Sequence, residues 1–276
     1  MHNGDDTDFY LRKGFRVLAV EAAPQHIERA NARFRAAIET DRLTILNVAV
    51  ADFEGEIEFF LSEEDLWAST RADMADRGLG AAQQRIVVPC TTLDKILVTY
   101  PTPYFIKIDV EGRDRDCIES LRRLPEKPRF VSFEADSAEP DQTTAMLSML
   151  VSYGYKRFKL VNQATHSVLR MPNPPLEGRY VDTRFNNHMS GPFGEESPGP
   201  WMSIEQVSER FDQTVRRQAA RIELSSRGTM FGIPMARLYR PLKWLYNTPV
   251  ATRARIYYAR KRGVEVGGWF DIHAAL

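Results

Sequence analysis

The chain has 276 residues, 43% of them hydrophobic, with 37 basic and 37 acidic side chains and therefore a formal net charge of zero. This length and composition suit one globular domain, or one domain with an appendage. A neutral chain argues against a nucleic-acid-binding protein, because such a surface needs a basic excess. No apolar run reaches the ~18 residues of a membrane-spanning helix, and the polar, acidic start is unlike a secretory signal. We therefore expect a soluble cytoplasmic protein.

Short apolar runs alternate with helical segments through the first part of the chain. Continuous apolar runs are typical of buried parallel strands and occur at 15–21, 43–50, 104–109 and 129–135. Apolar spacing predicts helices at 24–38 and 141–153, and Thr92 is placed to cap a short helix at 92–97. Another helix is expected at 113–124. Further strands are expected at 56–61 and 85–93, around a polar loop at 62–82, with a closing antiparallel pair at 155–161 and 166–170. This order predicts a doubly wound α/β sheet.

The composition changes near residue 171, so we divide the chain into a domain of residues 1–171 and an extension of residues 172–276. Proline and glycine predict irregular structure at 171–178 and 190–201. A helix is expected to follow Ser203, because Ser203 and Gln206 form a capping-box pattern. The apolar end of the chain, residues 267–276, should pack back on the domain.

Residues 229–263 contain eight Lys or Arg, six aromatic residues and no acid, so the rest of the chain carries −8 (0 − 8). This segment suits a lid over a substrate site, a docking surface for an anionic partner, or an in-plane contact with a membrane surface. A solvated basic helix that packs its aromatic residues on the core would show the same pattern.

Acidic residues stand at or just past four predicted strands: Glu21, Asp52, Asp109 and Glu134. Ligands of open parallel sheets bind beyond the carboxyl ends of the strands. A carboxylate at the position of Glu21 can accept two hydrogen bonds from a ribose diol, although an ordinary exposed acid would look the same.

The loop GDDT, residues 4–7, precedes the first of these strands. Gly4 allows either a close approach to a ligand or a plain turn. Asp5, Asp6 or Thr7 can cap the short helix that follows. Acids in this loop disfavour a pyrophosphate and tolerate a cationic ligand.

The sharpest local motif is KIDVEG, residues 107–112. Lys107 and Asp109 share one face of their strand because side chains alternate with period two. Glu111 follows in the loop, and Gly112 permits a tight turn. The motif suits a ligand site at the strand end, or an aspartate that caps the next helix.

Together these motifs resemble the FkbM family of S-adenosylmethionine-dependent methyltransferases. The matching stretches are HNGDDTDFYLRKGFRVLAVEAAP (2–24), NVAVAD (47–52), TTLD (91–94), YFIKIDVEG (104–112) and KPRFVSFEAD (127–136). The resemblance implies a mostly parallel, Rossmann-like class I methyltransferase sheet, followed here by a mainly helical extension. It also implies O-methylation of a hydroxyl on a sugar, glycan or small metabolite.

The resemblance assigns roles to individual residues. It places the ribose of S-adenosylmethionine at Glu21, the adenine near Asp52 and the methionine moiety beside Asp109. The expected cofactor-binding set is Gly4, Asp5, Thr7, Glu21, Ala22, Ala51, Asp52 and Asp109. A hydroxyl acceptor needs a base for its proton, and the expected catalytic residues are Asp109, Glu111, Glu134 and His188.

No metal is expected. Asp109, Glu111 and Glu134 could ligate a divalent ion, but nothing in their spacing demands one. The two cysteines, Cys90 and Cys117, are too few for a zinc cluster and lie among apolar neighbours, so we expect buried thiols.

The chain departs from the family pattern at its start. Family members begin with a central strand that ends in an acid and a glycine, whereas here Met1 stands where the glycine loop is already under way. That strand would lie between 15–21 and 104–109, and its loss leaves backbone groups without partners. Our hypothesis is that the gene starts upstream of Met1; the alternative is a cofactor-poor remnant.

Two other functions remain open. A non-catalytic binding protein on the same fold would explain the absent first strand. A nicotinamide-dependent oxidoreductase would also use Glu21 for a ribose, but the GxGxxG motif is missing and the GDDT loop is acidic.

Overall fold

The structure, a computed structural model, describes residues 1–62, 68–69, 83–110, 112–186, 189–227, 229–230, 233–234, 248–261 and 268–276. It is an α/β fold with mixed sheets. Predicted elements that fall elsewhere, including most of the 62–82 loop and much of 229–263, lie outside the described residues.

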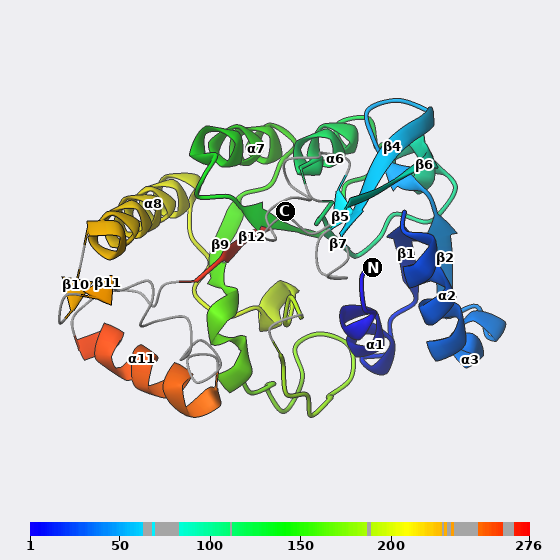
Figure 1. Cartoon of the computed structure of the whole chain (residues 1–276). Coiled ribbons are helices and arrows are strands. Elements are labelled where there is room, and N and C mark those ends of the chain that lie inside the picture. The colour runs from blue at the N-terminus through cyan, green and yellow to red at the C-terminus, as the bar shows by residue number, and fades with distance from the viewer. Residues whose placement is uncertain are drawn as a thin grey trace.

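The central sheet has four strands in the order β7-β8-β12-β9. Its strands are β7 (Phe105–Lys107), β8 (Phe130–Ala135), β9 (Arg157–Asn162) and β12 (Phe270–Ala275). β7 and β8 run parallel, whereas β12 is antiparallel to both β8 and β9. The apolar end of the chain therefore packs back on the domain as expected, and it does so as an inner strand of the sheet (Figure 1).

Two further sheets belong to the first half of the chain. β1 (Val17–Glu21) pairs in parallel with β2 (Leu43–Asn47). The order β3-β6-β4-β5 describes the other sheet, built from β3 (Ala49–Val50), β4 (Gly55–Ser62), β5 (Ala68–Ser69) and β6 (Gln83–Thr91). β3 and β6 are parallel, and β4 is antiparallel to β5 and β6. Later in the chain, β10 (Thr229–Met230) pairs antiparallel with β11 (Ile233–Pro234).

Helices cover one face of the central sheet and form the main core with it. These are α5 (Leu93–Val98), α6 (Asp114–Leu121), α7 (Pro140–Ser152) and α8 (Ile204–Arg227). Ile118, Leu150 and Val207 are fully buried against the sheet residues Val131 and Ile272. The capping box at the start of α8 is confirmed, since Ser203 N donates to Gln206 Oε1 (2.9 Å) and Gln206 N to Ser203 Oγ (3.4 Å).

The opposite face of the sheet is covered by α1 (Asp5–Arg12) and by the irregular segment 171–201, whose short turn is η2 (Gly194–Glu196). Phe193 of this segment stacks on Phe105 of β7 at 4.4 Å between ring centroids. A buried ion pair between Lys13 Nζ and Glu196 Oε2 (2.7 Å) holds the segment to the end of α1. The remaining helices are α2 (Pro24–Arg33), α3 (Arg35–Glu39), η1 (Gln163–Val168) and α11 (Pro249–Lys261).

Three predictions need correction. The strand at 166–170 is wrong, because η1 occupies that position and β12 is the antiparallel partner of β9. The helix at 24–38 breaks at Phe34, which leaves the helical region at φ −112° and separates α2 from α3. The mostly parallel sheet is mixed, because β12 enters it antiparallel. The boundary at residue 171 stays a prediction, although β12 from the proposed extension lies inside the central sheet.

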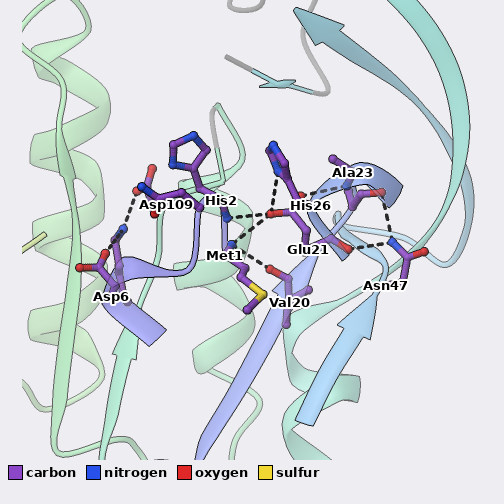
Figure 2. A network of polar contacts seen from close by, with 12 residues as sticks. Met1, His2, Asp6, Val20, Glu21, Ala23, His26, Asn47 and Asp109 are labelled. Atoms are coloured by element: carbon purple, nitrogen blue, oxygen red, sulfur yellow. Dashed lines mark hydrogen bonds and ion pairs between the residues drawn. The ribbon is translucent and has the colours of Figure 1, made fainter. Parts of the chain in front are cut away.

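β1 and β7 do not pair with each other. Among the described strands, β1 pairs with β2 and β7 with β8. Met1 and His2 lie in the space between Glu21, at the end of β1, and Asp109, which follows β7 (Figure 2). Met1 N donates to Val20 O (3.2 Å), so the first residues supply part of the polar lining there.

Replacement of Ile272 tests the place of β12 in the core. Ile272 is 0% exposed between β8 and β9. Ile272→Ala should lower the free energy of unfolding by about 2–5 kcal/mol, because the cavity cannot close fully. Urea unfolding measures the loss. The control is Val87→Ala on β6, whose side chain is 60% exposed, and it should lower the free energy of unfolding far less. Equal losses in the two variants would contradict the place of β12 inside the core.

Candidate functional site

Glu21 ends β1 with both carboxylate oxygens engaged. Oε1 accepts a hydrogen bond from Ala23 N (2.9 Å), and Oε2 accepts one from His2 N (2.9 Å). The Met1 ammonium lies 3.3 Å and His26 Nδ1 3.4 Å from Oε2 (Figure 2). Burial alone would raise the pKa of Glu21, but His26, the ammonium and the two backbone N–H groups lower it to about 2. Glu21 is therefore a buried, ionised carboxylate.

Asn47 fixes the backbone that follows Glu21. It ends β2, the parallel partner of β1, and its Nδ2 donates to Glu21 O (3.0 Å) and Ala22 O (3.2 Å). Parallel pairing brings the carboxyl ends of both strands to one edge, so one side-chain amide can reach both carbonyls. The turn after Glu21 is thus fixed by Asn47 and by the hydrogen bond from Ala23 N to the Glu21 carboxylate.

Lys107 lies between two carboxylates at the neighbouring sheet edge. Its Nζ is 3.1 Å from Asp6 Oδ2 on α1 and 2.8 Å from Asp109 Oδ2. Burial lowers the pKa of Lys107, but the charges of Asp109 and Asp6 more than offset this effect, so the pKa lies well above its ordinary value. Desolvation raises the pKa of Asp109, and the Lys107 ammonium more than offsets this, so the net shift is downward. Both groups of the pair are charged at neutral pH.

Further carboxyl groups surround this pair. Glu134 near the end of β8 is the register partner of Asp271 of β12 in the antiparallel ladder, and the Asp271 carboxyl group interacts with Glu134, Asp109 and Lys107. Burial, with the charge of Asp109, raises the pKa of Asp114 to about 6. Burial also raises the pKa of Asp271 well above its ordinary value. Carboxyl groups thus gather at this edge with Lys107 among them.

The loop before α1 is held by contacts within the chain. Gly4 has φ +81°, and a Cβ there would lie 2.7 Å from Phe34 Cε2, so the glycine is needed for both its conformation and this approach. Gly4 is itself the N-cap residue, and it is Asn3 Oδ1 that accepts the hydrogen bond from Asp5 N (3.0 Å). Capping by Asp5, Asp6 or Thr7 is therefore wrong.

The side chains of Asp5 and Thr7 in this loop pack against other parts of the chain. The Asp5 carboxylate accepts from Arg33 (2.9 Å) and Asn186 (3.2 Å), and Thr7 is buried. Burial raises the pKa of Asp5, but Arg33 and Asn186 lower it for a net decrease. The predicted cofactor contacts of Gly4, Asp5 and Thr7 stay predictions.

The remaining predicted residues fall into two groups. Ala22 and Ala51 are buried in one apolar cluster, while Asp52, just past β3, is 65% exposed and lies 3.0 Å from Arg113 Nη1. Glu111 and His188 lie outside the described residues, so the structure says nothing of them. The structure thus places Asp109 and Glu134 each near Asp271, and it pairs Asp52 with Arg113, just before α6.

Sequence reasoning missed four contributors: His26, Asn47, Asp271 and the charge role of Asp6. The sequence does contain a signal for Asp271. In FDIHAA, Asp271 and His273 stand two residues apart among apolar residues, and this spacing predicts a strand with one polar face. The residues that this face would meet could not be read without knowing that β12 pairs with β8.

Three properties of the described residues bear on the site. Within the described ranges, no group of three or more His, Cys, Asp or Glu side chains is arranged to hold a metal ion. No helix within these ranges is long and apolar enough to cross a membrane. In the described part of 229–263, Tyr257 and Tyr258 of α11 are exposed, and the predicted anionic partner or membrane surface stays a prediction.

Residues 1–157 match the family model of the Methyltransferase FkbM domain. Among solved structures, the chain is similar to a crystal structure of Methyltransferase FkbM from Methylobacillus flagellatus KT, with 18% identity and a TM-score of 0.35. That match covers 52% of this chain and 32% of the other, so the chain spans about a third of that protein's length. No curated protein matches significantly.

Glu21→Gln tests the buried carboxylate. The pKa of Glu21 falls from 4.5 to about 2 on folding, so its stabilisation is present above pH 4.5 and is lost as pH falls toward 2. The variant should lower the free energy of unfolding by about 3 kcal/mol at neutral pH, with the difference shrinking below about pH 5. Urea unfolding at several pH values measures this.

Glu58→Gln is the matched control. Glu58 is 49% exposed and pairs with Arg85 on the surface of β4, so its loss should cost under about 1 kcal/mol. A Glu21→Gln variant as stable as this control at neutral pH would contradict the charged state assigned to Glu21.

Proposed function

The chain belongs to the FkbM methyltransferase family, and we propose that it uses S-adenosylmethionine to methylate a hydroxyl on a sugar, glycan or small metabolite. The observation that carries this proposal is the gathering of carboxyl groups around Lys107 at the carboxyl ends of β7 and β8. In this proposal the β1-β2 and β7-β8-β12-β9 sheets are two parts of one doubly wound, Rossmann-like arrangement, whose ligands bind at that edge.

The charge of the edge fits a cationic cofactor. Four carboxyl groups interact with one lysine there: Asp6, Asp109, Asp114 and Asp271. A fifth, Glu134, interacts with Asp271. Such an excess of negative charge in a partly buried site attracts cations more strongly than it would in water. The cofactor carries a sulfonium and an ammonium group. Asp109 is the exposed member of the cluster, at 42%, and would meet these groups first.

Glu21 fits the ribose with one rearrangement. Ala23 N holds Oε1 and so fixes the orientation of the carboxylate. Oε2 faces the N-terminal residues, so ribose hydroxyls would replace the His2 N–H and the Met1 ammonium there. Because the carboxylate is ionised well below neutral pH, it is ready to accept these hydrogen bonds.

The acceptor needs orientation and a base. The bound cofactor would supply a methyl group activated by the positive sulfur. The chain must place the hydroxyl in line with it and take its proton. Among the residues that the structure describes, Glu134 is our candidate for the base; it lies near the carboxyl end of β8, opposite Asp271. Glu111 and His188 remain candidates from the sequence.

Calorimetric titration tests the proposal. S-adenosylmethionine should bind the wild-type chain in the micromolar range, and Asp109→Asn should weaken binding at least tenfold, because a carboxylate next to the positive groups is lost. The control is Asp212→Asn on the exposed side of α8, which should bind like the wild type.

The possible outcomes separate the functions. Binding that Asp109→Asn leaves unchanged would remove Asp109 from the site. Absence of binding, with folded protein, would favour a non-catalytic protein on the same fold. Binding of a nicotinamide dinucleotide instead would favour the oxidoreductase.

A further inference from the structure

Asp271 is a buried carboxyl group at the ligand edge of the sheet. It is 4% exposed and lies near the start of β12. Because β12 runs antiparallel to β8, its start meets the carboxyl end of β8, and Asp271 stands opposite Glu134. An acid from the far end of the chain thus lies near Asp109 of the KIDVEG motif.

Charged and polar groups from every neighbouring element face Asp271. They are Lys107 and Asp109 from β7 and its following loop, Glu134 from β8, Tyr10 from α1 and Gln163 from η1. On β12 itself, His273 shares the same face, with Lys159 of β9 and His166 of η1 next to it. Burial lowers the pKa of His273 to about 3, so this histidine is neutral.

These surroundings favour a protonated Asp271 in the free protein. Burial opposes its ionisation, and the charges of Asp109 and Glu134 oppose it further. Lys107 and the Gln163 side chain favour ionisation, but Lys107 is already paired with Asp6 and Asp109. A second positive charge at this edge would shift the balance, because it would interact with the ionised form alone.

We propose that Asp271 is a proton-linked residue of the cofactor site, protonated in the free protein and ionised when the cationic cofactor binds beside Asp109. This inference rests on the proposed function. It predicts that the positive sulfur itself drives part of the proton release. S-adenosylhomocysteine, whose sulfur is neutral, should therefore release less, since the two ligands share every other charged group.

Calorimetry in two buffers of different ionisation enthalpy measures the protons released per ligand bound. The wild type should release more protons with S-adenosylmethionine than with S-adenosylhomocysteine. Its preference for S-adenosylmethionine should rise with pH, by at most tenfold per pH unit, while Asp271 titrates. Asp271→Asn has nearly the same shape as the protonated acid. Above neutral pH, where Asp114 with its pKa of about 6 is already ionised, this variant should abolish both differences. Asp212→Asn should keep them.

A second measurement needs no variant. The carboxyl carbon of Asp271, followed by NMR in wild-type protein with labelled aspartate, should titrate at a lower pH with S-adenosylmethionine than with S-adenosylhomocysteine. Equal proton release by the two ligands, or the wild-type difference persisting in Asp271→Asn, would overturn this inference and leave the proposed function standing. Failure of both ligands to bind would overturn the proposed function and the inference together.

Discussion

The ammonium of Lys107 is the interaction on which the site depends. It joins Asp6 of α1 to Asp109 beyond β7, at 3.1 Å and 2.8 Å, and so ties the N-terminal helix to the central sheet. One cation cannot neutralise all the carboxyl groups around it, and taking them out of water without partners is costly. The chain meets this constraint in two ways. Asp109 stays partly exposed, and Asp271 lies where protonation is favoured. In the proposed function, the remaining negative charge is what favours a cationic ligand at this edge.

The position of β12 determines how that charge is assembled. Ile272 and Ala274 face the helical core, while Asp271 and His273 face the side covered by α1, η1 and the 171–201 segment. Alternation along one strand thus serves the core and the polar face at once. The covering segment is held by its own buried charges, including the Lys13–Glu196 pair. Residues from both ends of the chain therefore complete a site whose motifs lie in its first half.

Much of this arrangement could be predicted from local pattern. The apolar runs of β1, β2 and β8 and the cap of α8 are encoded in a few adjacent residues, and the KIDVEG motif marked Lys107 and Asp109 as neighbours. The antiparallel entry of β12 could not be predicted, because it depends on pairing between segments more than a hundred residues apart. The same holds for the neighbours of Asp271. The contacts of Asn47 with the end of β1, and the approach of Phe34 to Gly4 that gives this glycine a packing role, span fewer residues but also depend on how separate elements pack.

The central claim is that the cofactor binds at the carboxyl edge formed by β1, β7 and β8. Hydrogen exchange followed by mass spectrometry, with and without saturating S-adenosylmethionine, tests this claim most directly, because bound ligand slows the opening of the backbone that it contacts. The account predicts slower exchange in peptides that contain residues 21–23 and 108–110, and unchanged exchange in peptides from α8. Slower exchange confined to α8 or α11, with residues 21–23 and 108–110 unaffected, would contradict it.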